Sequence, residues 1–519
     1  MGLGRGPHSA RCRSPIWGVF GRGFLTEVGA LRLPYDEPVN VVELFARHDP
    51  SGVAFVCGDR SQTYGELTER VAAARTSLGE RCPRGSNVVV VGESSIEFIE
   101  ALFAALSAGL PVVPLHPRYP RGEIELAVEL ANPALVISTD VASAALAKDL
   151  GAPHLDASEL FGELDAPIAP PVDLEPDHPA LLMFTSGTAG RPRIAVLSHR
   201  NIAASIQHST ASAPSLVREH QVILGVMPLT HVLGIVSVVA VAITVGSTVV
   251  LSTKVDVDSI ADIVMAHQVT FLVAPPVFWY RLANSDVRPQ QIASVKAALS
   301  GAAPLSGAVA DTILERYELT LRQGYGLTEA SPGLTSALGT EAPATSVGRP
   351  MPGVKLRLVD ESGTDVLIGD VGEIWAKGAN IFSGYLGDPE ATAAVIDADG
   401  WLRTGDLAVV DESGFLYIVG RNKDQIIVSG FNVHPGEVEE RLVEHHTVAA
   451  AAVVGEPDPE YGEIVVAYLV AARSMEPDAD VLEAHCRTRL AGYKVPSRFE
   501  VVAELPQTAT GKVKRRMLR

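Results

Sequence analysis

The chain has 519 residues and a net charge of −19 at pH 7, with 47 % apolar and 20 % charged residues. This length exceeds what one hydrophobic core usually serves, so we expect at least two domains. The negative charge argues against nucleic acid as a partner, because phosphate backbones require a basic surface.

The first 25 residues contain four arginines and no acidic residue, and their apolar run from Ile16 is interrupted by Arg22. Such a segment is a poor secretory signal. We predict that residues 1–25 are a disordered leader or follow from a start codon assigned too early. The four cysteines are scattered and lack CxxC spacing, which disfavours a disulfide framework or a zinc site and favours a cytoplasmic location.

Strand and helix signals alternate through the first half of the chain. Asn87–Val91 is a short apolar run typical of a buried parallel strand. Ser95 can cap a helix that ends at Gly109, and the runs Leu110–Val113 and Ala134–Ile137 follow as strands. This alternation predicts α/β layers around mostly parallel sheets.

The stretch Val232–Leu251 contains 20 residues without a charge, which is long enough to span a bilayer. Glycine, serine and threonine interrupt it, so we predict a buried helix, a turn at Gly246 and a buried strand over Thr248–Leu251. A transmembrane segment is therefore not expected, although peripheral contact with a membrane stays open.

A domain boundary is expected near Gly420–Asp424, because about a hundred residues of mixed pattern follow it. Two apolar strands, Ala449–Val454 and Ile464–Ala471, precede a helix over Val481–Leu490. We expect a large multi-layer α/β domain over residues 26–420, a connection at 421–424 and a small α+β domain over 425–519. Oligomeric state is not indicated by the sequence.

The most distinctive local motif runs from Thr185 to Arg193 and reads TSGTAGRPR, directly after an apolar strand at Leu181–Phe184. Glycines and small hydroxyl residues let backbone N–H groups approach a polyphosphate. The segment is not a Walker loop, since it lacks the GK[ST] ending. Alone, such a segment after a strand is more often an ordinary turn.

Six further motifs follow this segment: Met227–Gly234, Ser300–Pro304, Gln323–Glu329, Trp401–Asp406, Gly420–Asp424 and Pro506–Lys512. Because these motifs occur in this order, the chain resembles the adenylate-forming superfamily of acyl-CoA ligases, nonribosomal-peptide adenylation domains and luciferases. The resemblance extends from about Val41 to Arg519. The chain is most similar to fatty-acyl-CoA or coumarate-type CoA ligases. The resemblance implies that a carboxylate is joined to AMP with loss of pyrophosphate and then transferred to a thiol, with ATP, Mg²⁺ and CoA required.

The resemblance also implies roles for individual residues. Lys512 would be the catalytic lysine that bridges the substrate carboxylate and the α-phosphate, where positive charge is the main requirement. Glu329 and Thr185 would hold Mg²⁺, a cation that prefers oxygen ligands. Thr328 would contact the α-phosphate, and Tyr325 would stack on adenine.

On the ribose, Asp406 would accept hydrogen bonds from the two hydroxyl groups and Arg421 would add a charged contact. Lys423 matches the hinge at which members of the family rotate the small domain between the two half-reactions. His231 matches a histidine near the acyl pocket and is a candidate catalytic residue, although a lone histidine is often structural.

The remaining nucleotide contacts implied by the resemblance are Ser186, Gly187, Thr188, Gly190, Arg193, Gly301, Ala302, Ala303 and Gly326. The acyl pocket would contain, besides His231, the small residues Gly301, Ala302, Gly326 and Gly333. The CoA tunnel would be formed near Ser429, Gly430 and Phe431.

Three positions depart from the family pattern, with Ala189, Arg193 and Ile194 where threonine, lysine and glycine are usual. An arginine keeps the positive charge but changes its geometry, so the rate is more in question than the reaction class.

The substrate is less defined. The segment Leu229–Gly234 holds no aspartate for a substrate ammonium, which disfavours an amino acid. No insertion follows Glu329, which favours CoA over a carrier protein. We expect a medium- or long-chain fatty acid. The alternatives are an aryl-acid CoA ligase, an acyl-AMP ligase that loads a carrier protein, and a non-catalytic nucleotide-binding relative.

Overall fold

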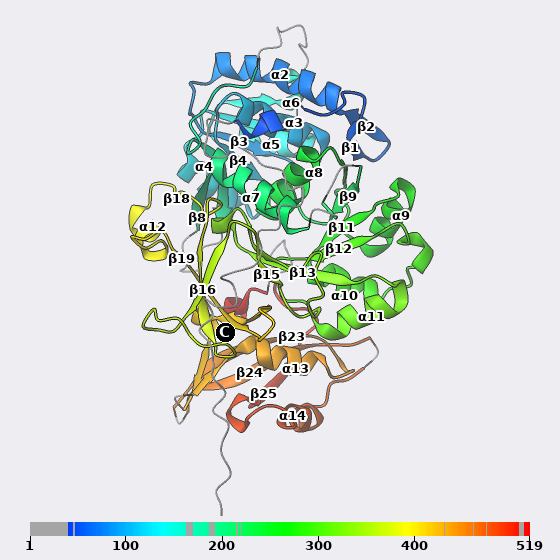
Figure 1. The fold of residues 1–519 in the computed structure, drawn as a ribbon, viewed down its shortest axis with the longest axis vertical. Helices are drawn as coiled ribbons and strands as arrows, with labels where there is room; N and C mark the ends of the chain where they lie inside the picture. The colour runs from blue at the N-terminus through cyan, green and yellow to red at the C-terminus, as the bar shows by residue number, and fades with distance from the viewer. Residues whose placement is uncertain are drawn as a thin grey trace, which may run out of the picture.

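A computed structural model describes residues 40–44, 47–161, 170–185, 192–213, 216–217, 220–429, 431–459, 461–473, 475–507 and 513–518. These residues form a large N-terminal domain with mostly parallel major sheets and a smaller C-terminal domain, as expected (Figure 1). The expected leader, residues 1–25, lies outside the described residues. The boundaries at residues 420 and 424 stay predictions.

A seven-stranded sheet forms the first layer of the large domain, in the order β18-β8-β7-β4-β3-β5-β6. Its strands are β3 (Val88–Val91), β4 (Val112–Leu115), β5 (Leu135–Ser138), β6 (His154–Asp156), β7 (Pro179–Thr185), β8 (Arg193–Ser198) and β18 (Gly384–Tyr385). Strand β3 consists of four fully buried valines, because β-branched side chains suit a strand covered on both faces. The strands from β7 to β6 run parallel, which confirms the predicted alternation.

A nine-stranded sheet forms the second layer, in the order β15-β14-β13-β12-β11-β9-β10-β1-β2. Its strands are β1 (Val53–Cys57), β2 (Arg60–Thr63), β9 (Val222–Gly225), β10 (Thr248–Leu251), β11 (Phe271–Ala274), β12 (Ala297–Ser300), β13 (Leu321–Gly326), β14 (Gly333–Ser336) and β15 (Arg349–Pro350). The strands between β1 and β13 are parallel. Strand β13 carries Tyr325 and Gly326 to its carboxyl end, where ligands bind in α/β folds.

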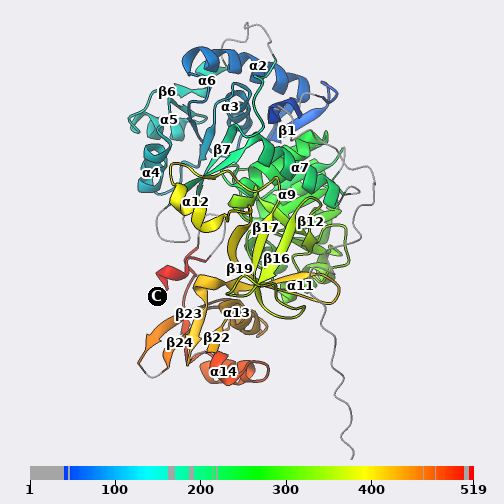
Figure 2. The ribbon, with the colours of Figure 1, turned by 60° about the vertical axis from the view of Figure 1, so that its left-hand side comes forward.

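Helices cover these sheets in both views (Figures 1 and 2). They are α2 (Tyr64–Arg81), α3 (Ile96–Ser107), α4 (Arg121–Ala131), α5 (Val141–Lys148), α6 (Ala157–Leu160), α7 (His199–Ser212), α8 (Val241–Thr244), α9 (Val257–His267), α10 (Pro276–Ala283), α11 (Gly307–Tyr317) and α12 (Pro389–Val395). Short single-turn helices are η1 (Val41–Leu44), η3 (Pro289–Gln291) and η4 (Thr328–Ala330). Helix α3 begins as predicted at Ser95, whose side chain accepts from the Phe98 N–H.

The uncharged stretch from Val232 forms a buried π-helix, η2 (Leu233–Ala240), which continues into α8. Gly246 turns the chain at φ +73°, and β10 follows, so the predicted helix, turn and strand are confirmed. Across the described part of the chain, no helix combines the length and the apolar character that a membrane crossing requires.

A four-stranded antiparallel sheet joins the two large layers to the small domain. It consists of β16 (Lys355–Val359), β17 (Gly372–Lys377), β19 (Leu402–Val410) and β20 (Leu416–Arg421). Strands β19 and β20 pair so that Asp406 lies opposite Arg421.

The small domain (orange to red in Figure 1) contains its own sheet and its own apolar core. Its elements are η5 (Asn422–Asp424), β21 (Ile426–Val428), β22 (Phe431–Val433), α13 (Pro435–Val443), β23 (Val448–Asp458), β24 (Gly462–Ala471), α14 (Ala479–Arg487), η6 (Gly492–Lys494), β25 (Arg498–Val501) and η7 (Arg515–Met517). The predicted strands and helix of this region are all present, with shifted ends.

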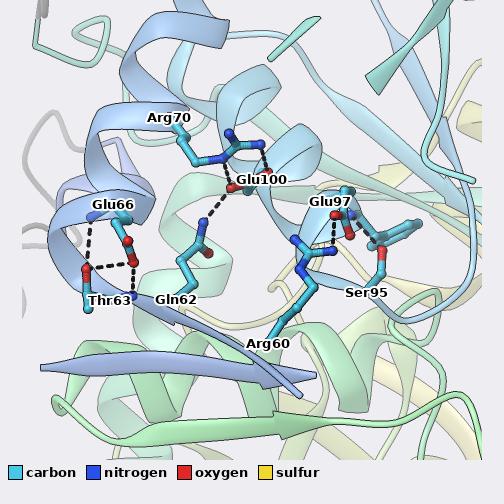
Figure 3. A network of polar contacts seen from close by, with 9 residues as sticks. Arg60, Gln62, Thr63, Glu66, Arg70, Ser95, Glu97 and Glu100 are labelled. Atoms are coloured by element: carbon cyan, nitrogen blue, oxygen red, sulfur yellow. Dashed lines mark hydrogen bonds and ion pairs between the residues drawn. The ribbon is translucent and has the colours of Figure 1, made fainter. Parts of the chain in front are cut away.

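A polar network ties β2 and α2 to α3 (Figure 3). Glu100 of α3 is 1 % exposed and accepts from the Arg70 guanidinium and the Gln62 amide. Thr63 and Glu66 form a reciprocal capping box at the start of α2. The buried carboxylate of Glu100 is therefore matched by hydrogen-bond donors from two other elements.

Candidate active site

Three of the predicted nucleotide residues, Tyr325, Asp406 and Arg421, meet at β19. Asp406 is 4 % exposed, and its Oδ2 accepts from the Tyr325 hydroxyl at 2.7 Å. Its Oδ1 lies 2.8 Å from Nε of Arg421, the residue opposite it in the sheet. The structure thus brings together three residues from β13, β19 and β20 that the sequence separates widely.

Tyr325 takes part in this cluster as a hydrogen-bond donor. Burial, followed by the negative charge of Asp406, raises the pKa of Tyr325 well above its usual value. The hydroxyl therefore stays protonated and fixes the ring beside the ribose-binding candidate. This contact was not predicted from the sequence, which suggested only stacking on adenine; that stacking stays a prediction.

The candidate metal ligand Glu329 lies with Thr328 on η4, directly after β13. Its Oε1 accepts from the Tyr385 hydroxyl at 2.8 Å, and its backbone carbonyl accepts from the Phe382 N–H at 2.9 Å. Burial and then the charge of Glu329 raise the pKa of Tyr385, so this hydroxyl also remains a donor. Sequence reasoning missed Tyr385, since one tyrosine after a glycine carries no chemical signature.

The oxygen donors at this position fit Mg²⁺, which prefers carboxylate and hydroxyl oxygens. Among the described residues, no group of three or more histidine, cysteine, aspartate or glutamate side chains could hold a metal ion. The predicted co-ligand Thr185 ends β7 and donates its hydroxyl to the Arg193 carbonyl at 3.3 Å.

Arg193, one of the departures from the family pattern, begins β8. Its Nε donates to Asp388 Oδ2 at 2.9 Å, and its guanidinium lies 5.4 Å from the centre of the Tyr385 ring. The backbone N–H of Ala391 and then Arg193 lower the pKa of Asp388, so the pair is ionised. The guanidinium is thus held next to the Glu329 cluster, and its contact with nucleotide stays a prediction.

The predicted acyl region contains small residues, and apolar side chains lie against two of them. A Cβ on Gly301 would lie 3.4 Å from the Leu233 side chain, and one on Gly333 would lie 2.9 Å from Met351. A Cβ on Gly326 would lie 1.9 Å from the Pro332 carbonyl oxygen, so only glycine fits there. The remaining predicted contacts, Ala302 and Ala303, follow Gly301 after β12, with Ala302 at φ +73°.

His231 precedes the π-helix, and its Nδ1 accepts from the Leu233 N–H at 3.2 Å. This contact gives the histidine a local structural role at the start of η2. The predicted roles of His231 in the acyl pocket and in catalysis stay predictions.

On the small domain, Phe431 is 56 % exposed and stacks on Tyr493 of η6, with ring centres 4.8 Å apart. The neighbouring Ser429 has φ +50°, and its N–H donates to the Tyr461 carbonyl at 2.7 Å. The predicted CoA face therefore presents a solvent-exposed aromatic pair, which is suited to a flat ligand surface.

Several predicted site residues lie outside the described residues: Ser186, Gly187, Thr188, Gly190, Gly430 and Lys512. The backbone of Lys423 belongs to η5, whereas its side chain lies outside the description. Their roles stay predictions.

A cavity of about 210 Å³ opens beside the Met227–Pro228 motif. Its wall includes His116 and the cationic side chains of Arg118 and Lys254. Arg118 pairs with Glu93 at 2.8 Å, and burial followed by the charge of Arg118 lowers the pKa of His116. Glu93 also lines the cavity and neutralises Arg118, so Lys254 supplies the remaining positive charge near the carboxyl ends of parallel strands.

The chain is similar to known proteins over most of its length. The family described as AMP-binding enzyme matches residues 42–386, and the AMP-binding enzyme C-terminal domain matches residues 437–512. A feruloyl-CoA synthase from Amycolatopsis sp is 36 % identical over 477 residues, which cover 90 % of this chain and 95 % of that protein. A long-chain-fatty-acid–CoA ligase from Bacillus subtilis is 38 % identical over 351 residues, or 66 % of this chain and 62 % of that protein. Among solved structures, ATP-bound MatB from Rhodopseudomonas palustris superposes with a TM-score of 0.87 at 28 % identity, covering 94 % of this chain and 98 % of that one.

Proposed function

The chain belongs to the AMP-binding enzymes, which are adenylate-forming acid–thiol ligases, and from this premise we propose that it converts an apolar carboxylic acid to its CoA thioester. The observation that supports the apolar substrate is the position of Leu233 against Gly301 and of Met351 against Gly333, the latter glycine close in the chain to Glu329. Burying a charged or strongly polar substrate group among such side chains would be costly.

In the first half-reaction the substrate carboxylate attacks the α-phosphorus of ATP, and pyrophosphate leaves as the acyl-AMP bond forms. Asp406 accepts from the ribose hydroxyl groups while Tyr325 and Arg421 hold its carboxylate in place. Glu329, with Thr185, would hold Mg²⁺, which supplies positive charge to the phosphates when bound. Lys512 draws the two anionic reactants together and stabilises the charge that develops between them.

In the second half-reaction the CoA thiol attacks the acyl carbonyl carbon and AMP leaves. We assign the exposed pair Phe431 and Tyr493 to the face that meets CoA, because aromatic rings can stack on its adenine. Rotation of the small domain about Lys423 would exchange the Lys512 loop for the Phe431 face between the two steps.

Two substrate classes are the candidates. An aryl acid such as that of the feruloyl-CoA synthase comes first, because that relative is similar over nearly the whole chain. A medium- or long-chain fatty acid comes second, favoured by the flexible thioether of Met351 beside Gly333 and by the Bacillus subtilis relative.

The experiment is a pyrophosphate-release assay with ATP and Mg²⁺ over aryl acids, fatty acids and amino acids, with product analysis after addition of CoA. One acid class should give both pyrophosphate and acyl-CoA. Lys512→Ala should slow the first step by roughly a hundred- to thousandfold, as for other preorganised donors. Lys514→Ala, which removes a lysine two positions away, should not.

Two results would contradict the proposal. If none of the acids on the panel supports pyrophosphate release, a non-catalytic relative would be favoured. Formation of acyl-AMP that is never transferred to CoA would point to a carrier protein as the acceptor.

A further inference from the structure

The segment between β17 and α12 runs alongside the Glu329 loop and contacts it at several points. The Phe382 N–H donates to the Glu329 carbonyl at 2.9 Å, and the Tyr385 hydroxyl donates to Glu329 Oε1 at 2.8 Å. The segment is itself attached to the seven-stranded sheet, because the Ser383 N–H donates to the Val196 carbonyl at 2.9 Å and β18 pairs with β8. Both the main chain and the carboxylate of Glu329 are thus tied to a rigid element.

Asn380, in the same segment, holds the turn that follows Glu329. Its side chain is completely buried, and its Nδ2 donates to the carbonyls of Ala330 at 2.8 Å and Gly333 at 2.9 Å. These two carbonyls lie at either end of the turn between η4 and β14. One amide group therefore fixes the spacing between the candidate metal ligand and the first strand residue of the acyl region.

Asn380 is fixed in turn by helix α7. The Asn201 side chain donates to the carbonyls of Ala379 at 2.8 Å and Ile381 at 2.7 Å, on both sides of Asn380. Asn201 is 5 % exposed and also accepts, through Oδ1, from the Ser198 N–H at 2.9 Å. A buried chain of amides therefore runs from α7 through Asn380 to the Glu329 turn.

We propose that Tyr385 and Asn380 are positioning residues for Glu329, with Tyr385 orienting its carboxylate and Asn380 setting the turn that carries it. The inference rests on the proposed function of Glu329 as a ligand of Mg²⁺. A carboxylate ligand that another side chain already orients loses less conformational freedom when it binds its cation. Removal of such an outer partner typically lowers metal affinity by about 10- to 100-fold. Tyr385 engages Oε1 of Glu329, so Oε2 would be the oxygen that holds the cation.

A purely structural role for Tyr385 would come from its packing. Its ring meets Phe382 edge-on, with centres 5.0 Å apart, and lies below the Arg193 guanidinium. Tyr385→Phe keeps this ring and removes only the hydroxyl. Tyr417→Phe is the matched control, because the Tyr417 hydroxyl donates to the Asp411 carboxylate at 3.0 Å, elsewhere on the antiparallel sheet.

The test is a Mg²⁺ titration of pyrophosphate release at saturating ATP, for the native enzyme, Tyr385→Phe, Glu329→Gln, their double variant and Tyr417→Phe. Tyr385→Phe should raise the half-saturating Mg²⁺ concentration by about 10- to 100-fold, as for other outer partners of metal ligands. The double variant should match Glu329→Gln, because the hydroxyl acts only through that carboxylate. Tyr417→Phe should match the native enzyme.

A second readout does not depend on turnover. Electron paramagnetic resonance of Mn²⁺ with enzyme and ATP, in the absence of any acid substrate, should show the same loss of affinity in Tyr385→Phe. Asn380→Asp, which turns a donor into a carboxylate facing two carbonyls, should weaken Mn²⁺ binding in the same direction. If Asn380→Asp fails to fold, Tyr385→Phe still decides the matter.

The outcomes separate the inference from the proposed function. If Glu329→Gln weakens the metal response while Tyr385→Phe behaves as Tyr417→Phe does, the inference is wrong and the role of Glu329 stands. If Glu329→Gln leaves the metal response unchanged, the proposed role of Glu329 is wrong and the inference falls with it.

Discussion

Asp406→Asn is the substitution that tests the nucleotide site most directly. The asparagine side chain keeps the shape of the aspartate, which is 4 % exposed, but it loses the charge and one acceptor oxygen. Its amide nitrogen must then face either the Tyr325 hydroxyl, which would have to turn and accept, or Arg421, where a donor would meet a donor. The ribose hydroxyl groups lose a charged acceptor at the same time.

The magnitude follows from the hydrogen bonds involved. A hydrogen bond to a charged group contributes about 1.5–3 kcal/mol, whereas a neutral one contributes about 1 kcal/mol. Water can solvate part of the charge left on Arg421, because its side chain is 26 % exposed. We therefore expect kcat/KM for ATP to fall by about 10- to 100-fold, since 1.4 kcal/mol corresponds to a factor of ten. The ribose is remote from the reacting phosphorus, so most of the change should be in KM.

The measurement is the dependence of pyrophosphate release on ATP concentration. Asp411→Asn is the control, because Asp411 lies on the same hairpin and its carboxylate also accepts a tyrosine hydroxyl, that of Tyr417. Asp411→Asn should leave KM for ATP unchanged. If the two variants have the same KM for ATP, Asp406 does not bind the nucleotide and the reasoning is refuted.

Gly326→Ala should abolish pyrophosphate release, because its Cβ would lie 1.9 Å from the Pro332 carbonyl oxygen and the loop to Glu329 must move; near-native release would contradict this. Glu100→Ala should lower the free energy of unfolding by about 2–4 kcal/mol, since it leaves the partly buried Arg70 without its carboxylate, and urea unfolding would measure it. Burial lowers the pKa of His208 to about 4, so its contribution to stability is complete above its unfolded pKa near 6.5 and is lost as the pH falls towards 4. Between pH 7 and pH 5 His208 should therefore lower the free energy of unfolding by about 2 kcal/mol, and urea unfolding should show that this part of the pH dependence is missing in His208→Gln. The same pH dependence in the native protein and the variant would contradict the assignment.

Much of the fold was predictable because its signals are local. The four valines of β3 and the Ser95 cap of α3 specify a strand and a helix within a few residues of sequence. The uncharged stretch after Val232 was also read correctly as helix, turn and strand, because Gly246 marks the turn. Its π-helical form was not predicted, since apolar periodicity does not distinguish helix types.

The missed part of the site depends on contacts between distant segments. Strand β18 has only two residues, too few for any periodic signal, yet it pairs with β8 almost two hundred residues earlier and delivers Tyr385 to Glu329. Asn380 reads as an ordinary loop residue, because its partners Ala330 and Gly333 are backbone carbonyls that any sequence would offer. The motifs predict which residues meet the ligands, whereas only the tertiary structure reveals which side chains position those residues.

Two ion pairs flank Lys423, the proposed hinge, and we infer from them that nucleotide binding and rotation of the small domain are coupled. Arg421 is anchored to the large domain through Asp406 at 2.8 Å, whereas Asp424 is linked to the small domain through Arg515 at 3.5 Å. A rotation that preserves both pairs must be taken up by the two residues between these anchors, one of which is Lys423. Ribose hydroxyl groups that bind Asp406 would share its carboxylate with Arg421. Nucleotide binding would therefore change the ion pair that attaches Arg421 to the large domain beside Lys423. We therefore expect the nucleotide state at Asp406 to influence when the small domain turns.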